Sequence, residues 1–373
     1  MMKTVMLVFG TRPEAIKLCP LVNALKQQGD RFRVVTCVTA QHREMLDQVL
    51  NVFHVTPDYD LNLMKKDQSL SDLTARVLTA VDGVLEREQV DVLLVQGDTT
   101  TTFATALAAY YHRIPVGHVE AGLRTGNKFS PYPEEINRKL TTAIADIHFA
   151  PTAANRQNLL AEGVPESAIH VTGNTVIDAL LWVRELIRAE KREFPELAGI
   201  DFGKRVIVVT GHRRESFGPG FVHLCNALRD IAASHPEVQI VYPVHLNPNV
   251  RKPVLELLSG LPNVTLLEPL DYEPFVSLMD KSFFIITDSG GVQEEAPSLG
   301  KPVLVARDTT ERPEALASGG VVLVGTERDV IVREAERLLS DPAAYQRMAH
   351  VQNPYGDGQA CGRVIAALTR SAD

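Results

Sequence analysis

Short runs of valine, isoleucine and leucine recur along the chain, and a longer amphipathic segment separates each run from the next. This alternation is typical of a parallel sheet with helices on both faces, because the strands of such a sheet are buried on both sides. The pattern therefore predicts an α/β protein with two doubly wound, Rossmann-like domains. The predicted strands of the first sheet are 5–9, 33–38, 92–95, 116–118 and 147–150, and those of the second are 205–209, 239–242, 264–267, 283–287, 302–305 and 321–324.

A long helical pattern of mixed charge interrupts the alternation near the middle of the chain, at 176–191, and the irregular stretch 192–203 follows it. At 373 residues the chain is longer than one hydrophobic core usually organises. We therefore expect two domains whose sheets present their carboxyl ends to a shared interdomain cleft. The expected divisions are an N-terminal domain over 1–175, a linker over 176–203, a C-terminal domain over 204–357 and a helix within 358–373 that the sequence assigns to neither domain.

The net charge of −8 and the pI near 5.8 disfavour a nucleic-acid-binding protein but allow a local basic pocket for one phosphorylated ligand. No apolar run is long enough to span a membrane, and residues 1–10 lack the pattern of a signal peptide, so we expect a cytoplasmic protein. The cysteines are widely spaced without a Cys-x-x-Cys pair, which predicts neither a zinc site nor a disulfide framework. They are Cys19, Cys37, Cys225 and Cys361.

The first predicted strand ends in a turn that contains one glycine, Gly10, and therefore differs from the Gly-x-Gly-x-x-Gly turn of nicotinamide-binding proteins. Pro13 suits the first turn of a helix. Arg12 and Lys17 place two cations near the start of that helix, where an anionic ligand can bind. The alternative is a cluster of surface ion pairs.

Acidic residues follow two of the predicted strands and one proline-rich loop. Asp98 follows strand 92–95, Glu120 follows strand 116–118, and Glu134 follows a Pro-Tyr-Pro segment that leads into a helix. Because parallel strands end at one edge of a sheet, we expect these carboxylates to converge there. Their repulsion would favour protonation of one of them, which suits general acid–base catalysis. Two alternatives stay open: Asp98 caps the next helix, or arginines such as Arg124 and Arg138 neutralise the group.

The second half offers groups that suit a nucleotide. His212 lies in a basic loop after strand 205–209, where it can hold a diphosphate or act as an acid or base. Small residues after strand 283–287 allow backbone N–H groups to approach phosphate oxygens, and Glu295 on the following helix can accept bonds from ribose hydroxyls. Arg312 follows the next strand and supplies a further cation. The small residues are Ser289, Gly290 and Gly291.

Six motifs follow one another along the chain: Phe-Gly-Thr-Arg-Pro-Glu-Ala-Ile-Lys, Gly-Asp-Thr-Thr-Thr-Thr, His-Val-Glu-Ala-Gly-Leu-Arg, Gly-His-Arg-Arg-Glu-Ser, Asp-Ser-Gly-Gly-Val-Gln-Glu-Glu and Arg-Asp-Thr-Thr-Glu-Arg-Pro-Glu. Together they closely resemble the motifs of the non-hydrolysing bacterial UDP-N-acetylglucosamine 2-epimerases, and the resemblance extends from Gly10 to the segment 353–358. It implies the two-domain glycosyltransferase-B architecture and the conversion of UDP-N-acetylglucosamine to UDP-N-acetylmannosamine by elimination and re-addition of UDP. That product would supply bacterial surface polysaccharide synthesis.

The resemblance also implies residue roles. The catalytic carboxylates would be Asp98, Glu120 and Glu134, Phe275 would lie beside the uracil, and Leu270 would lie in a loop whose backbone contacts it. It further implies a homodimer that uses neither a cofactor nor a metal. Residues around a second substrate site in some relatives resemble Gln41, His42 and His245, and the residues implied around UDP are Arg12, Lys17, His212, Ser289, Gly290, Gly291, Glu295 and Arg312.

Three other functions fit parts of this sequence. A glycosyltransferase of the same architecture would share the nucleotide groups of the second domain but would not need the carboxylates of the first. A hydrolysing epimerase would release free N-acetylmannosamine. A catalytically silent sensor of nucleotide sugars would bind the substrate without turnover.

Overall fold

The computed structural model describes residues 2–40, 43–63, 65, 68–211 and 218–370. Its contacts divide the chain into two compact units. Unit 1 comprises Met1–Ala179 and Tyr355–Asp373, and unit 2 comprises Leu180–Pro354. Each unit is built around its own parallel sheet, so each is described separately below.

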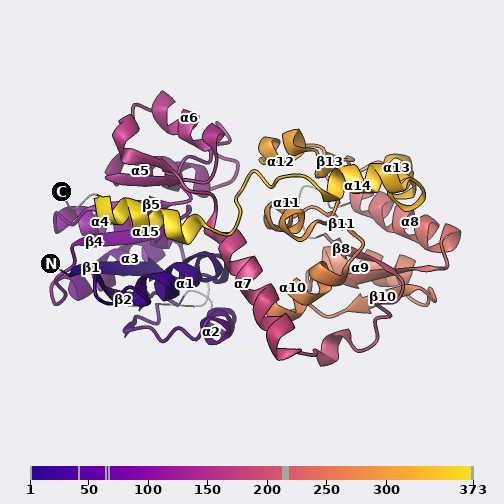
Figure 1. Cartoon of the computed structure of the whole chain (residues 1–373), viewed down its shortest axis with the longest axis horizontal. Coiled ribbons are helices and arrows are strands. Elements are labelled where there is room, and N and C mark those ends of the chain that lie inside the picture. The colour runs from indigo at the N-terminus through magenta and orange to yellow at the C-terminus, as the bar shows by residue number, and fades with distance from the viewer. Residues whose placement is uncertain (1, 41–42, 64, 66–67, 212–217, 371–373) are drawn as a thin grey trace. The chain divides into compact units, whose positions relative to one another are not determined.

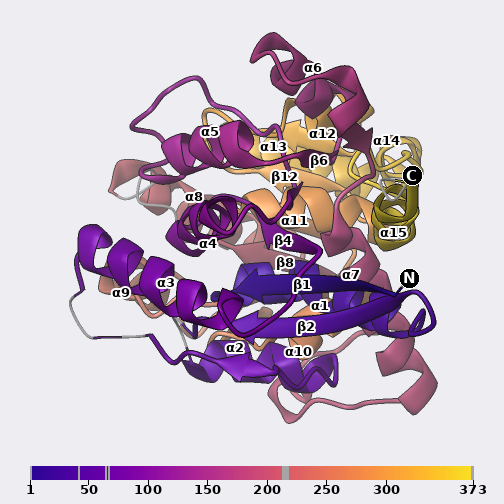
Figure 2. The ribbon, with the colours of Figure 1, turned by 90° about the vertical axis from the view of Figure 1, so that its left-hand side faces the viewer.

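The sheet of unit 1 has the strand order β3-β2-β1-β4-β5-β6-β7, and every pairing is parallel. Figure 2 shows β1 and β2 side by side, and the intervening helices lie around the sheet (Figure 1). The chain order reverses between β1 and β4, which makes that position the topological switch point. The strands are β1 (Lys3–Phe9), β2 (Phe32–Val38), β3 (Tyr59–Asp60), β4 (Val92–Gln96), β5 (Val116–Val119), β6 (Ile147–Ala150) and β7 (Ile169–Val171), and the helices are α1 (Arg12–Lys26), α2 (Arg43–Val52), α3 (Leu70–Leu85), α4 (Thr100–Tyr111), α5 (Glu134–Ile144) and α6 (Ala153–Ala161).

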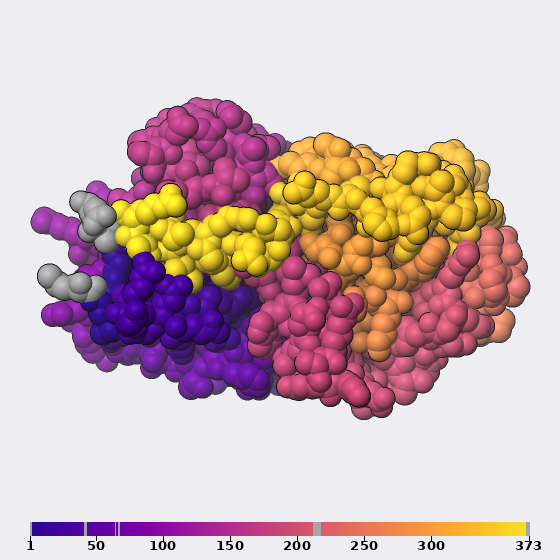
Figure 3. All heavy atoms as spheres, in the orientation of Figure 1, coloured from indigo at the N-terminus to yellow at the C-terminus, as the bar shows by residue number. Residues whose placement is uncertain are grey.

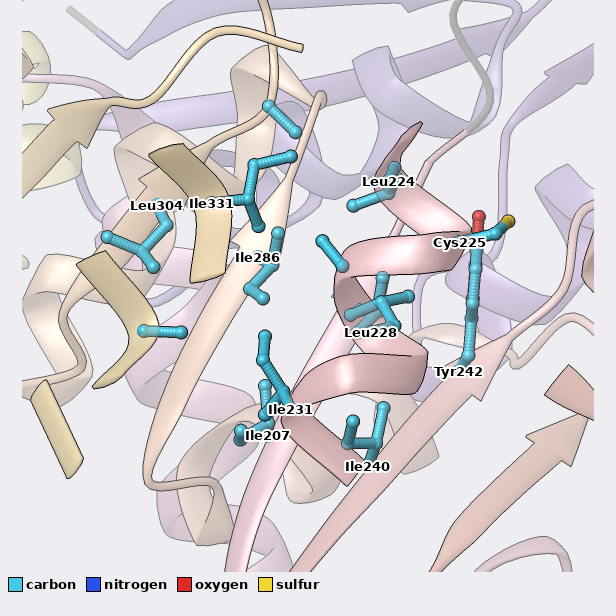
Figure 4. Close-up of a cluster of buried hydrophobic side chains, with 14 of the residues drawn as sticks. Ile207, Leu224, Cys225, Leu228, Ile231, Ile240, Tyr242, Ile286, Leu304 and Ile331 are labelled. Carbon is cyan, nitrogen blue, oxygen red and sulfur yellow. The ribbon is translucent and has the colours of Figure 1, made fainter. Parts of the chain in front are cut away.

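The sheet of unit 2 has the order β10-β9-β8-β11-β12-β13, is also parallel throughout, and has its switch point between β8 and β11. Figure 4 shows the apolar side chains that pack between this sheet and α8, among them Leu228, Ile231 and Ile286. The strands are β8 (Arg205–Thr210), β9 (Val238–Pro243), β10 (Val264–Leu267), β11 (Phe284–Thr287), β12 (Val303–Val305) and β13 (Val321–Leu323), and the helices are α8 (Pro219–Ser234), α9 (Pro248–Leu258), α10 (Tyr272–Lys281), α11 (Gly290–Glu295), α12 (Pro313–Ser318), α13 (Arg328–Ser340) and α14 (Pro342–Ala349).

These two sheets confirm the predicted α/β fold class with two Rossmann-like domains. Each strand expected from an apolar run is present, with ends that differ by at most two residues. The sequence did not predict β3 and β7, which are the two edge strands of unit 1. Both are only two or three residues long and partly exposed, so neither required the apolar run that marks a buried strand.

The helix expected near the middle of the chain is α7 (Thr175–Glu190), and the boundary between the units falls within it, after Ala179. The C-terminal helix α15 (Ala360–Arg370) belongs to unit 1. Asp178 of α7 accepts hydrogen bonds from the backbone of Ala360 and Cys361 at 3.1 and 2.9 Å, and Lys3 Nζ donates to the Leu368 carbonyl at 3.1 Å. Figure 3 shows the yellow atoms of α15 against the indigo N-terminal segment.

All four cysteines are unpaired and buried. Burial raises the pKa of Cys37 to about 12 and that of Cys225 to about 12. The thiols are therefore neutral at physiological pH and act as small apolar packing groups.

Two kinds of feature are absent from the described ranges. No helix there is both long and apolar enough to cross a membrane. The same residues contain no group of three His, Cys, Asp or Glu side chains placed to hold a metal ion.

Candidate active site

Some of the predicted site residues follow the strands that flank the switch point of their unit. In unit 1, Arg12 follows β1 and Asp98 follows β4. In unit 2, Gly211 follows β8 and Ser289 follows β11. Ligands of doubly wound sheets bind at the carboxyl ends of strands at this position, because there the two neighbouring loops diverge. Each unit therefore carries its candidate groups where its topology provides a binding edge.

Arg12 is the first residue of α1, and Thr11 caps the helix together with Glu14. In the described part of the chain, the Arg12 guanidinium forms no ion pair, so the alternative of a surface ion-pair cluster does not hold for Arg12. The preceding turn requires glycine, since a Cβ atom at Gly10 would lie 1.9 Å from Thr39 Oγ1. This close packing against β2 fixes the turn from which Arg12 projects.

Asp98 forms an ion pair with Arg138 of α5, and its backbone carbonyl accepts a bond from Asn137 Nδ2 at 2.9 Å. The alternative that Asp98 caps α4 is wrong, because Thr99 is the N-cap and its side chain accepts a bond from Thr102 N. The Asp98 carboxylate is therefore not used to begin the helix. It is 22% exposed and stays accessible beside its arginine.

Glu120 immediately follows β5 and adopts a left-handed backbone conformation, with φ of 64°. This conformation is unfavourable for a residue with a Cβ atom and marks sites where the surroundings fix the backbone. The carboxylate oxygen Oε2 pairs with Lys17 and accepts bonds from Gln96 Nε2 at 2.9 Å and Asn174 Nδ2 at 3.2 Å. Three elements of unit 1 thus orient one buried carboxylate.

Glu134 and Glu135 begin α5 but have different surroundings. The Oε2 atom of Glu134 is buried and has no hydrogen-bond partner among the described residues. Glu135, by contrast, accepts backbone bonds from Thr125 and Gly126, both at 3.1 Å. Glu135 therefore holds the loop before α5, whereas one oxygen of Glu134 is left for another partner.

His118 of β5 is fully buried, and its Nε2 lies 2.7 Å from the Gly97 carbonyl, one residue before Asp98. Burial lowers the pKa of His118 from 6.5 to about 3, and this outweighs the bond to Gly97. The ring is therefore neutral at physiological pH, and because a carbonyl only accepts, Nε2 carries the proton. His118 thus supports the turn that carries Asp98.

In unit 2, Ser289 is the N-cap residue of α11, but its side chain forms no capping bond. Ser289 N instead donates to Thr287 Oγ1 at 2.9 Å. Gly290 and Gly291 form the first turn of the helix, and a Cβ atom at Gly291 would approach Glu295 Oε2 at 3.7 Å. The turn is thus made of small residues beside the Glu295 carboxylate.

Glu294 and Glu295 of α11 also differ. Glu295 is 8% exposed, and its Oε1 accepts a bond from the Tyr272 hydroxyl at 3.3 Å. Glu294 is 1% exposed and pairs with Arg312, which precedes α12. The structure therefore ties Arg312 to α11, next to the residue expected at the ribose.

The remaining predicted residues lie in several places. Phe275 is partly buried in α10, Leu270 precedes that helix, and His245 is exposed in the segment between β9 and α9. His212 and the pair Gln41 and His42 lie outside the described residues.

Several residues that hold the site residues in place were missed by the sequence analysis as individual contributors. Gln96 and Asn174 orient Glu120, and Glu294 holds Arg312. These contacts depend on the tertiary fold, so sequence spacing gives no signal for them. Glu14 is different, because Thr-Arg-Pro-Glu has the Thr-x-x-Glu spacing of a capping box and the structure contains that motif.

Comparisons with known proteins identify the family of the chain. The family model described as UDP-N-acetylglucosamine 2-epimerase matches residues 23–369. The chain is 60% identical to UDP-N-acetylglucosamine 2-epimerases of Yersinia pestis, over 98% of each chain, and of Escherichia coli K12, also over 98% of each. It is similar in structure to the UDP-GlcNAc 2-epimerase from Neisseria meningitidis bound to UDP-GlcNAc, with a TM-score of 0.91 and 50% identity over 98% of this chain and 100% of that one. The chain therefore belongs to the UDP-N-acetylglucosamine 2-epimerase family of isomerases.

Proposed function

We propose that this protein interconverts UDP-N-acetylglucosamine and UDP-N-acetylmannosamine at C2 without releasing the free sugar. The proposal rests on its family and on the carboxylates of unit 1. Its main support is that unit 1 contains three carboxylates, each beside different neighbouring groups. Asp98 pairs with an arginine, Glu120 pairs with a lysine, and Glu134 has one buried oxygen without a partner among the described residues.

The chemistry explains why more than one carboxylate is useful. The C2 proton of the sugar has no adjacent carbonyl to acidify it, so direct exchange would be slow. In the proposed reaction a carboxylate removes this proton, the C1–O bond to UDP breaks, and a C1=C2 double bond forms in 2-acetamidoglucal. A UDP oxygen then re-adds at C1, and a proton is delivered to C2 from the opposite face. Because the proton leaves one face and returns to the other, two positioned groups are needed.

Two further tasks in the proposed reaction are the binding of UDP and the stabilisation of the leaving diphosphate. Unit 2 would hold UDP through the Ser289–Gly291 turn and through Glu295 at the ribose hydroxyls. Arg12 and Lys17 would stabilise the negative charge that develops on the leaving diphosphate. Arg138 and Lys17 place a positive charge directly beside Asp98 and Glu120, respectively.

Two further parts of the proposal concern assembly and pathway. The family resemblance implies a homodimer. Light scattering at several concentrations tests it. The product would feed bacterial surface polysaccharide synthesis, as the family resemblance implies.

Turnover in heavy water tests the reaction. With UDP-N-acetylglucosamine as substrate, we expect solvent deuterium at C2 of the UDP-N-acetylmannosamine that forms, because the group that returns a proton to C2 differs from the group that removes one and exchanges its own proton with solvent. Mass spectrometry and proton NMR measure it. Epimer that keeps its original C2 hydrogen would exclude the mechanism. Free N-acetylmannosamine would indicate a hydrolysing enzyme, and transfer to an acceptor without epimer would indicate a glycosyltransferase.

Variants then separate the three carboxylates. Asp98→Asn, Glu120→Gln and Glu134→Gln keep side-chain size but remove the titrating group, and we expect Asp98→Asn to be the most damaging. Added nicotinamide cofactor should not change the wild-type rate, since no oxidation step is involved. A rate that depends on the cofactor would contradict the elimination.

A further inference from the structure

A single buried carboxylate, Glu14, joins the turn that carries Arg12 to the turn that carries Asp98. The residue is 1% exposed. Its Oε2 accepts bonds from Gly10 N at 3.0 Å, Thr11 N at 2.8 Å and Thr11 Oγ1 at 2.8 Å, all in the β1–α1 turn. Its Oε1 accepts a bond from Thr99 Oγ1 at 2.6 Å, at the start of α4. Thr102 Oγ1 lies 3.1 Å from the same oxygen and donates to the Gln96 carbonyl at 2.6 Å.

The two turns lie on opposite sides of the switch point, because β1 and β4 are adjacent strands at which the chain order reverses. Loops diverge at such a position, and nothing in sheet pairing fixes the distance between them. One carboxylate that bonds to both turns supplies that constraint. Arg12 directly follows the first group of donors, and Asp98 directly precedes Thr99 of the second.

We infer that Glu14 is a positioning residue that fixes the diphosphate-binding cation Arg12 relative to the proton-transfer carboxylate Asp98. The inference rests on the proposed function. Glu14 itself touches neither substrate nor reacting atoms in this scheme. It acts through two backbone turns, so its loss should disturb the alignment of Arg12 and Asp98 rather than remove either group.

The chemistry of the contacts explains why a carboxylate is required. Gly10 N, Thr11 N, Thr11 Oγ1 and Thr99 Oγ1 donate to Glu14, and a carboxyl group has two oxygens with which to accept these bonds. Burial raises the pKa of Glu14 above its ordinary value, while the bonds from Thr99, Gly10 and Thr11 oppose this increase. A capping box needs only the bonds between Thr11 and Glu14, so the bonds from Gly10 N and Thr99 Oγ1 are additional to helix capping.

Glutamine at this position should affect the two turns unequally. The backbone N–H groups of Gly10 and Thr11 can only donate, so the single carbonyl oxygen of the glutamine would turn towards them. Its amide N–H groups would then face the Thr99 and Thr102 hydroxyls, which can rotate to accept. The α1 cap would survive, whereas the arrangement at α4 next to Asp98 would change.

The experiment compares Glu14→Gln, Thr99→Ala and Thr99→Ser with wild type. It measures kcat, the dissociation constant of UDP, the melting temperature and the ratio of released UDP and 2-acetamidoglucal to epimer. We expect kcat to fall roughly 10- to 100-fold in Glu14→Gln, as for a displacement near 1 Å at a reacting centre, while UDP affinity changes less than twofold. The ratio of released intermediate to epimer should rise, because re-addition needs both Arg12 and Asp98 in place.

Thr99→Ala should raise the same ratio, since it removes the hydroxyl bond to Glu14, although it also removes the cap of α4 and should lower the melting temperature. Thr99→Ser keeps both bonds and should restore the ratio. Asp178→Asn is the matched control. Asp178 is likewise a carboxylate of unit 1 that accepts two backbone bonds, and burial raises its pKa, but it joins α7 to α15. We expect this control to lower the melting temperature without changing the ratio.

The outcomes separate the inference from the proposed function. Wild type that incorporates no deuterium at C2 would overturn the proposed reaction, whatever the variants do. Wild type that incorporates deuterium, with an unchanged ratio in both Glu14→Gln and Thr99→Ala, would overturn the positioning role alone. Equal ratios in Glu14→Gln and Asp178→Asn would do the same. If Glu14→Gln does not fold, the two Thr99 variants decide the question.

Discussion

Lys17 Nζ forms an ion pair with Glu120 Oε2, and the two side chains are only 16% and 6% exposed. They come from different elements, since Lys17 lies in α1 and Glu120 follows β5. A pair this well buried is costly to break by removing one partner, because the remaining charge is left desolvated. The pair therefore links the stability of unit 1 to the orientation of a proposed catalytic carboxylate.

Replacement of Lys17 by Met should destabilise the protein by roughly 3 kcal/mol, because Glu120 stays buried without its cation. The double variant Lys17→Met/Glu120→Gln should recover most of that stability, since neither charge remains, but it should not recover turnover. Chemical denaturation and epimerase assays measure the two quantities. Lys26→Met, at the exposed end of α1, is the control. A double variant no more stable than Lys17→Met would show that the two residues are not energetically coupled.

Glu295→Ala should weaken UDP binding by about 1–3 kcal/mol through the loss of ribose hydrogen bonds. Tyr272→Phe should have a smaller effect in the same direction, because it removes the hydroxyl that orients Glu295 Oε1. Calorimetric titration with UDP gives both values. An unchanged dissociation constant for Glu295→Ala would remove this residue from the nucleotide site.

The buried histidines predict how stability depends on pH. Burial lowers the pKa of His118 to about 3 and that of His148 to about 4, against an ordinary value of 6.5 for both. As the pH falls below 6.5, the two histidines become protonated in the unfolded chain while they stay neutral in the folded protein. The histidines' contribution to stability is therefore fully present above pH 6.5 and is lost as the pH falls towards 4 and then 3.

We expect each of these residues to add roughly 1.4 kcal/mol per pH unit to the loss of stability once the unfolded form is protonated. Denaturation curves between pH 7 and pH 5 measure the slope, in a range above the usual titration of carboxylates. His148→Gln should be less stable at pH 7 but should have a shallower slope. His350→Gln changes an exposed histidine and should keep the wild-type slope. Equal slopes in both variants would argue against the buried neutral state.

The apolar runs were sufficient to predict both sheets because each central strand is buried on two faces. They did not predict β3 or β7, which lie at the edges and are partly exposed. The glycine and proline of the first turn predicted the start of α1, and the structure begins that helix at Arg12. Local spacing thus predicts elements that depend mainly on their own residues.

The partners of the charged site residues were harder to predict. The sequence analysis gave an arginine such as Arg138 as one alternative partner of Asp98, and the structure contains that ion pair. It gave Asp98 as the helix cap in another alternative, and the structure places the cap one residue later, at Thr99. Lys17 and Glu120 are 103 residues apart, and only the strand order brings α1 to the end of β5. Long-range contacts of this kind follow from topology, which periodicity does not specify.

Glu134 and Glu135 allow a catalytic role to be distinguished from a structural one, because they are adjacent in the same helix. Glu135→Gln must turn an amide N–H group towards the backbone N–H of Thr125 or Gly126, both of which donate at 3.1 Å to the native carboxylate. The mismatch should cost about 1–3 kcal/mol of stability. Glu134→Gln leaves these bonds intact and changes a side chain whose Oε2 has no partner among the described residues.

We therefore expect Glu134→Gln to keep the wild-type melting temperature but to lose at least roughly 100-fold in kcat, the usual contribution of a general acid or base. Glu135→Gln should lower the melting temperature and retain more turnover than Glu134→Gln when assayed well below its unfolding transition. Thermal unfolding and initial-rate assays of the two variants at one temperature compare them directly. If Glu134→Gln lowered stability as much as Glu135→Gln and kept wild-type turnover, the proton-transfer role proposed for Glu134 would be wrong, and its carboxylate would be a structural part of the α5 N-terminus.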